Sequence, residues 1–215
     1  MTEETCGDDE LVGATCPMNT PSTTSNVALA CHPECIPGFV EGIEARVELA
    51  ASGTLVVNHS LSGKIEKLRV STAGPVRRGD NLWQHTCFEI FIAAAENPGY
   101  YEFNFSPSGE WAIYRFFHYR ERAPVENMDR ILPSASWHHS SDLLTLDANI
   151  DLNDLPEIAR IRPMRLGVSA VIEDENGSLS YWALKHPASK PDFHHPEGFA
   201  LAIPPLPLTG GALRK

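Results

Sequence analysis

Residues 88–117 read FEIFIAAAENPGYYEFNFSPSGEWAIYRFF and hold the clearest evidence for the architecture of this chain. Three runs with strand character, 88–94, 100–106 and 110–117, are separated by two sequences typical of tight turns. Each turn contains a proline, which presets φ, and a glycine, which supplies positive φ. The segment therefore predicts three consecutive strands joined by turns. The first is nearly all apolar, which suits a sheet covered on both sides.

Similar patterns occur on both sides of this segment. Between 43 and 49 apolar residues alternate with charged ones, as in a half-buried strand, and Asn176-Gly177 predicts a hairpin turn. Only 153–160 hints at a helix. About ten strands at close spacing predict an all-β fold, an antiparallel β-sandwich or jelly roll. The other expected strands are 55–61, 65–70, 143–150, 166–173, 179–184 and 199–203.

The 215 residues fit one domain with two tails. Residues 1–30 are acidic, then rich in Thr, Ser, Asn and Pro, and lack an apolar period, so they predict a flexible extension. Residues 31–205 form the expected β domain, and 206–215 an irregular tail.

Charge and hydropathy restrict the class of partner. The formal net charge of −11 disfavours nucleic acid and anionic membrane surfaces, which attract positive charge. No run approaches the roughly 18 apolar residues of a membrane span, and no secretory signal is visible at the amino end. We therefore expect a cytoplasmic protein; oligomeric state is left open.

The five cysteines do not form a recognisable framework. Four lie near the amino end, namely Cys6, Cys16, Cys31 and Cys35, and Cys87 lies in an expected strand. An odd number without an export signal favours reduced thiols. The Cys31–Cys35 spacing lacks a matching downstream pair and does not specify zinc, so the role of the four amino-terminal cysteines stays open.

Alternation along the strands predicts a polar stripe. Glu89 shares a face with Cys87 and Phe91, and Glu102 shares a face with Asn104 on the next strand. If the two strands pair, these polar side chains meet on a sheet that is otherwise apolar. Buried carboxylates need hydrogen bonds or a charge partner, for which Arg115 is a candidate. The alternative is that Glu102 lies on a solvated outer face, which suits Glu89 less.

Two tryptophans, Trp83 and Trp182, lie next to polar loops. Flat indole faces suit the C–H faces of a sugar ring, while acids and amides bind its hydroxyls. The alternative is that both rings are lids of the core.

Three histidines, His85, His186 and His194, lie in the same two segments as the tryptophans. Haem needs an axial imidazole in an apolar pocket, and the chain has no C-x-x-C-H motif, so haem would be held non-covalently. The alternative is a structural, hydrogen-bonded imidazole at each position.

Catalytic motifs are weak. The sequence lacks G-x-S-x-G, H-E-x-x-H and a glycine-rich phosphate loop. Glu89 with Glu102 or Glu110 could imitate the carboxylate pair of a glycosidase. We expect a protein that is not an enzyme.

Three segments, WQHTCFE (83–89), YEFNFSPSGEW (101–111) and PDFHH (191–195), resemble bacterial DOMON-like proteins related to family 9 carbohydrate-binding modules. The resemblance runs from about Cys31 to Ile203 and implies a β-sandwich with a ligand pocket. In sugar-binding relatives a Trp followed six positions later by an acid is paired with a second Trp. Other relatives bind haem, and some carry a structural calcium, which is possible here.

These observations predict a non-catalytic protein that binds a small, sugar-like molecule between Trp83 and Trp182, without a cofactor. Haem with a histidine ligand is the alternative. The residues expected to bind the ligand are Trp83, His85, Glu89, Glu102, Asn104, Arg115, Trp182, His186 and His194.

Overall fold

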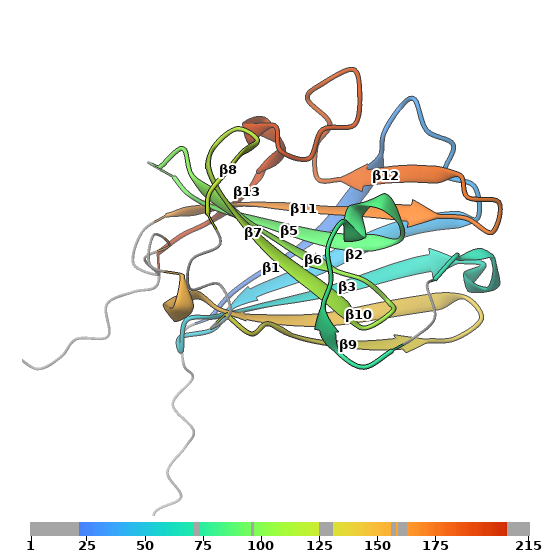
Figure 1. Cartoon of the computed structure of the whole chain (residues 1–215), viewed down its shortest axis with the longest axis horizontal. Coiled ribbons are helices and arrows are strands. Elements are labelled where there is room, and N and C mark those ends of the chain that lie inside the picture. The colour runs from blue at the N-terminus through green and yellow to red at the C-terminus, as the bar shows by residue number, and fades with distance from the viewer. Residues whose placement is uncertain are drawn as a thin grey trace, which may run out of the picture.

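The computed structural model describes residues 22–70, 74–95, 97–124, 131–155, 158 and 163–205. Strands dominate these residues, and the helical elements among them are short 3-10 turns, so the prediction of an all-β chain is confirmed (Figure 1). The strands are β1 (Thr23–Cys31), β2 (Val40–Leu49), β3 (Thr54–Gly63), β4 (Arg77–Arg78), β5 (Cys87–Ala94), β6 (Tyr100–Phe105), β7 (Glu110–His118), β8 (Glu121–Arg122), β9 (Ser134–His139), β10 (Leu143–Asp151), β11 (Met164–Glu173), β12 (Leu179–Ala183) and β13 (Leu201–Ile203); the 3-10 turns are η1 (Ile65–Lys67), η2 (Leu82–Gln84), η4 (Leu152–Asp154) and η5 (Pro196–Gly198).

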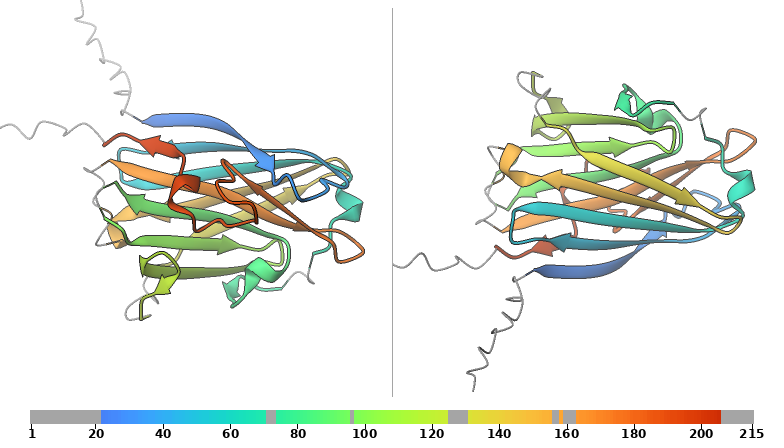
Figure 2. Two further views of the ribbon diagram at one scale, coloured as in Figure 1. Left: turned by 90° about the horizontal axis from the view of Figure 1, so that it is seen from above. Right: turned by 90° about the horizontal axis from the view of Figure 1, so that it is seen from below.

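These strands belong to one curled, 13-stranded sheet in the order β4-β7-β6-β5-β11-β12-β1-β2-β3-β10-β9, with β13 beside β11 and β8 beside β7. We call β1, β2, β3, β10 and β9 arm A, and the strands from β4 to β12 in that order arm B. Figure 2 shows the two arms lying over one another. The prediction of an antiparallel sandwich or jelly roll is met only in part. The strands form one continuous sheet, which is mixed because β4 pairs in parallel with β7.

Strand β1 joins the arms. Its first part pairs with β2, with Val27 opposite Ala45, and its last two residues pair with β12, with Ala30 opposite Ala183. The predicted flexible extension over residues 1–30 is therefore too long, because a strand begins at Thr23. Residues 1–21 and the predicted tail 206–215 lie outside the described residues.

The main core lies between the arms. On β5, Phe88, Ile90 and Ile92 point into it. The Phe88 ring contacts His59 of β3 at 5.2 Å and Trp137 of β9 at 5.5 Å between ring centroids. The burial of these side chains against both arms holds the curl closed.

A second apolar cluster covers the opposite face of arm B. It contains Cys87 and Phe91 of β5, and Phe91 stacks on Phe199 at 5.5 Å between ring centroids. Every residue of β5 is buried, which agrees with the covered strand predicted from its sequence. The face of β5 that carries Cys87 and Phe91 also carries Glu89.

Several local predictions are wrong. Residues 65–70 begin with η1 instead of a strand, and the predicted helix at 153–160 reduces in the described residues to η4. Strand β9 was not predicted, because its sequence SASWHH contains only two apolar residues, Ala135 and Trp137.

Cys31, Cys35 and Cys87 are free thiols; Cys6 and Cys16 lie outside the described residues. Within the described part of the chain no helix is long and apolar enough to cross a membrane. The same residues contain no group of three or more His, Cys, Asp or Glu side chains that could hold a metal ion.

Candidate functional site

A cavity of about 600 Å³ opens on the outer face of arm B, within the range typical of small-molecule sites. Its floor comes from β5 and β6, and its walls come from η2, β7, β8, β11, β12 and the segment 184–200, which we call the pocket loop. The lining residues are Trp83, Glu89, Glu102, Phe116, Arg120, Arg122, Val171, Tyr181, Lys190, Pro191, Phe193 and His194.

Two buried carboxyl groups form the polar part of the floor. Strands β5 and β6 pair as the alternation predicted, with Glu89 opposite Asn104 and Phe91 opposite Glu102. Glu89 is 3% exposed and Glu102 is 4% exposed, so the solvated outer face considered for Glu102 is excluded. The Asn104 side-chain amide donates a 2.7 Å hydrogen bond to Oε1 of Glu102 and fixes its orientation.

Burial strongly affects the charge of this pair. It raises the pKa of Glu102 to about 7, against which the Asn104 hydrogen bond acts. Burial, and then the neighbouring Glu102 carboxyl, raise the pKa of Glu89 well above its usual range. Among the described residues, Oε1 of Glu89 and Oδ1 of Asn104 have no hydrogen-bond partner. Buried polar atoms are nearly always paired, and Glu89 lines the cavity, so an incoming polar ligand meets one buried oxygen that lacks a partner.

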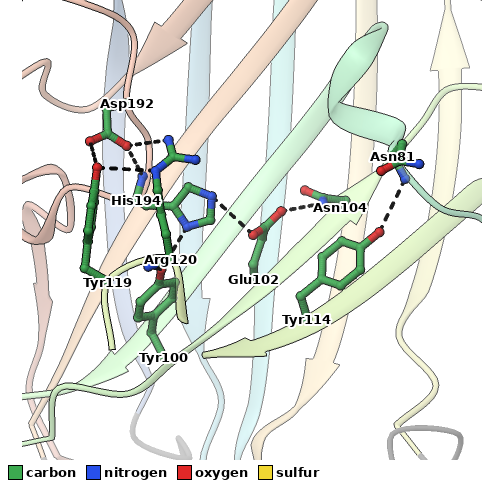
Figure 3. A network of polar contacts seen from close by, with 9 residues as sticks. All are labelled: Asn81, Tyr100, Glu102, Asn104, Tyr114, Tyr119, Arg120, Asp192 and His194. Atoms are coloured by element: carbon green, nitrogen blue, oxygen red, sulfur yellow. Dashed lines mark hydrogen bonds and ion pairs between the residues drawn. The ribbon is translucent and has the colours of Figure 1, made fainter. Parts of the chain in front are cut away.

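His194 lies beside this floor (Figure 3). Its Nδ1 is 2.8 Å from the Tyr100 hydroxyl, and its Nε2 is 3.6 Å from Oε2 of Glu102. Burial, together with the positive charge of Arg120, lowers the pKa of His194 to about 4. The imidazole is therefore neutral near pH 7 and can offer one N–H to the pocket.

Asp192 fastens the pocket loop to the turn between β7 and β8 (Figure 3). Its carboxylate accepts hydrogen bonds from the Tyr119 hydroxyl and the Arg120 guanidinium, both at 2.8 Å. Arg120 has a positive φ of 57°, a conformation that few non-glycine residues adopt. The two bonds hold this turn and the loop together over the cavity.

Trp83 forms an exposed wall. Within η2, Leu82 is buried in the second apolar cluster, while the neighbouring Trp83 is 46% exposed. The Tyr114 hydroxyl accepts a hydrogen bond from the backbone N–H of Asn81 and so ties this segment to β7. An indole held at the edge of a cavity is suited to stacking on a ligand.

The second wall is not Trp182. That side chain is 5% exposed, belongs to the core between the arms, and donates from Nε1 to the Ser180 hydroxyl at 3.0 Å. Because successive residues of a strand face opposite sides, the adjacent Tyr181 lines the cavity, with Phe193 6.1 Å away between ring centroids. Both walls are aromatic, but the sequence analysis placed Trp182 at the second wall, where the structure has its neighbour Tyr181.

Four further predicted residues do not line the cavity. Asn104 is buried and reaches the site only through its hydrogen bond to Glu102. Arg115 pairs with Tyr101 across β6 and β7, and its guanidinium lies 5.0 Å from the Phe117 ring centroid. His85 contacts Glu173 through Nδ1 at 2.7 Å. His186 contacts the backbone oxygen of Ala30 through Nε2 at 2.8 Å. The two histidine contacts correspond to the structural alternative considered for these residues.

Three basic residues of the lining were not predicted: Arg120, described above, Arg122 and Lys190. Arg122 places its guanidinium 3.9 Å from the Tyr114 ring centroid, and Lys190 comes from the pocket loop. The strand β8 that presents Arg122 is two residues long, too short to show a period, so no pattern in the sequence pointed to it.

A second depression, of about 420 Å³, lies on arm A and includes Glu44, Arg46, Asn58 and Asp147. Asn58 donates a 2.6 Å hydrogen bond to Asp147, so these polar groups satisfy each other. No Trp, Tyr or Phe lines it. We therefore assign the candidate site to arm B.

No family model matches the chain, and no curated protein matches it. Among solved structures, it is similar to a candidate carbohydrate-binding protein from Bacteroides uniformis, with a TM-score of 0.60 and 14% identity over 80% of this chain and 83% of the other. A family 9 carbohydrate-binding module from Caldicellulosiruptor kristjanssonii in complex with cellotriose gives a TM-score of 0.48 and 9% identity over 75% and 72% of the two chains. The first likeness shows a shared fold.

Proposed function

We propose that this chain is a non-catalytic protein that binds a small carbohydrate in the cavity of arm B. Trp83 on one side and Tyr181 with Phe193 on the other would hold the faces of a sugar ring. Glu89 and Glu102 would bind its hydroxyl groups, and Asn104 would orient Glu102. In this arrangement Tyr181 has the role that the sequence analysis expected of Trp182.

The observation that carries this proposal is the polar floor under aromatic walls. Oε1 of Glu89 is buried in the lining without a hydrogen-bond partner among the described residues. A sugar hydroxyl can donate to such an oxygen, while the apolar face of the same sugar packs on an aromatic ring. The description of the Bacteroides uniformis protein, which shares the fold, agrees with this class of ligand.

Binding without catalysis is favoured by the position of the two carboxyl groups. They lie on adjacent strands of one floor, whereas the carboxyl pair of a glycosidase flanks the bond that is cleaved. Release of product from a nitrophenyl glycoside, lost in Glu89→Gln, would contradict this part of the proposal.

Haem is the rival ligand. Of the three histidines considered for it, His194 alone lines the cavity, and its Nε2 faces the buried Glu102. Two carboxyl groups beside the ring make the pocket polar where a haem needs apolar surroundings, so we favour the sugar. Resemblance to DOMON-like proteins remains a prediction.

The test is a calorimetric titration of the full chain with monosaccharides and short oligosaccharides, repeated with Glu89→Gln and with haem. A stoichiometric sugar isotherm weakened in Glu89→Gln supports the proposal. A stoichiometric Soret shift with haem, lost in His194→Ala, together with no sugar isotherm, would replace it.

A further inference from the structure

We propose that the pocket selects an anionic sugar, either a uronate or a sugar phosphate, whose charged group is bound by Arg122 and Lys190. This inference rests on the proposed function, because it names the kind of carbohydrate that the same cavity takes. It follows from the positions and partners of the basic side chains in the lining.

Arg122 is held in place by an aromatic ring. Its guanidinium carbon lies 3.9 Å from the Tyr114 ring centroid and 6.0 Å from that of Phe116. Stacking orients the plane of an arginine while leaving its N–H groups free to bind a carboxylate or phosphate. Within the described part of the chain, no carboxylate lies within 4.0 Å of this guanidinium. The guanidinium is thus held in position without a bound anion.

Lys190 provides a second cation on the pocket loop. It is exposed, lines the cavity and has no ion pair with any described residue. The third cation of the lining, Arg120, differs from both, since its charge is matched by Asp192 at 2.8 Å. Arg122 and Lys190 are therefore the two cations available to a ligand.

Glu102 of the floor interacts electrostatically with Arg122, but burial acts more strongly on this carboxyl than that charge does. Both acids of the floor are buried carboxyl groups, which exist more readily in the neutral form than exposed ones do. Two cations without an ion pair among the described residues contrast with the formal net charge of −11 of the whole chain. Local positive charge on an acidic protein concentrates an anionic ligand at one place on its surface.

The experiment compares sugars that share a ring and differ in one substituent. Glucose, glucuronate and glucose 6-phosphate are titrated into the full chain at low salt, as are galactose and galacturonate. Inorganic phosphate and acetate are the ring-free controls. The variants are Arg122→Gln, Arg122→Lys and Lys190→Gln. Lys64→Gln, which removes an equal charge at an exposed position away from the cavity, is the matched control.

In each series at least one anionic member is expected to bind about tenfold more tightly than its neutral partner, as a charge-assisted hydrogen bond provides. Arg122→Gln and Lys190→Gln should each reduce that preference, while Lys64→Gln should not. Arg122→Lys should retain part of it. In the glucose series, glucuronate and glucose 6-phosphate are compared with glucose. The anion that binds more tightly shows whether the site selects a uronate or a sugar phosphate. Thermal melts show whether each variant is folded, and Lys190→Gln carries the test if Arg122→Gln is not.

Equal binding of neutral and anionic members in the wild type overturns this inference and leaves the proposed function intact. Binding of inorganic phosphate as tight as that of glucose 6-phosphate also overturns it, since the site would then bind an anion without the sugar. If no sugar of either series binds, the proposed function fails, and the inference fails with it.

Discussion

The Tyr100 hydroxyl and Nδ1 of His194 lie 2.8 Å apart and join the floor of the pocket to the loop that covers it. The same hydroxyl accepts the backbone N–H of Arg120 at 3.1 Å. Donating its proton to Nδ1 would leave the other nitrogen of a neutral imidazole as an N–H facing Glu102. One tyrosine thus orients His194 and positions the turn that carries Arg120.

Trp83→Ala should abolish sugar binding and change the free energy of unfolding by less than about 1 kcal/mol, because the ring is half-exposed. Trp182→Ala should instead destabilise the fold by about 3–5 kcal/mol, because that ring is buried in the core. Urea unfolding and a titration of both variants check the pair. A Trp83→Ala protein that unfolds would make Trp83 a core residue.

Affinity for a uronate, whose own carboxylate stays ionised throughout, should fall as the pH rises from 6 to 8. Burial raises the pKa of Glu102 to about 7, so the carboxyl is mostly neutral below this pH and charged above it, where it repels the ligand. The expected loss is about tenfold at most. Titrations at five pH values measure it. Glu102→Gln should give a flat profile, and a flat wild-type profile would contradict the prediction.

Asp192→Asn should weaken binding by roughly 3- to 10-fold, because the pocket loop must then be ordered by the ligand. The effect on global stability should stay below about 1 kcal/mol, since the Arg120–Asp192 pair is partly exposed. Calorimetry and urea unfolding measure the two quantities. Loss of stability with unchanged affinity would show that the contact supports the fold and not the site.

His59→Leu should protect the protein against acid. Both ring nitrogens of His59 lack partners among the described residues, and burial lowers its pKa from 6.5 to about 3. The unfolded chain takes up a proton below pH 6.5 that the folded one does not, so wild-type stability falls as the pH drops from 6.5 towards 3. The free energy of unfolding of His59→Leu, relative to that of the wild type, should rise by roughly 2 kcal/mol as the pH falls from 7 to 4.5. Urea unfolding at several pH values measures it.

The matched control is His138→Leu, which changes an exposed histidine on β9. Because His194 also has a lowered pKa, only the difference between variant and wild type isolates His59. A difference that is constant with pH would show that the pKa of His59 is not lowered in the folded state.

The periodicity of the sequence predicted the part of the site that lies on regular strands. Glu89, Glu102 and Asn104 were grouped correctly because the side-chain period of a strand is strict, and two turns fixed the neighbouring strands. The same rule places Trp182 and Tyr181 on opposite faces of β12. It does not say which of these faces is covered by the core. That depends on the curl of the sheet, which is a long-range property.

Residues outside regular strands were harder to predict. Arg122 and Lys190 lie on a two-residue strand and on a loop, where no period exists. Strand β1 was missed because Thr, Ser and Asn fill its first four positions, and β12, which pairs with its last residues, is remote in the sequence. Local composition there resembles that of an extension.

The position of β1 between the two arms has a consequence for synthesis of the protein. Ala30 cannot meet Ala183 until about 150 further residues have left the ribosome. Until then the edge of β1 that pairs with β12 stays open, and an open edge can pair with another nascent chain. Slower translation near the end of the gene, or a chaperone that shields β1, would therefore change the yield of folded protein more than the same intervention early in the chain.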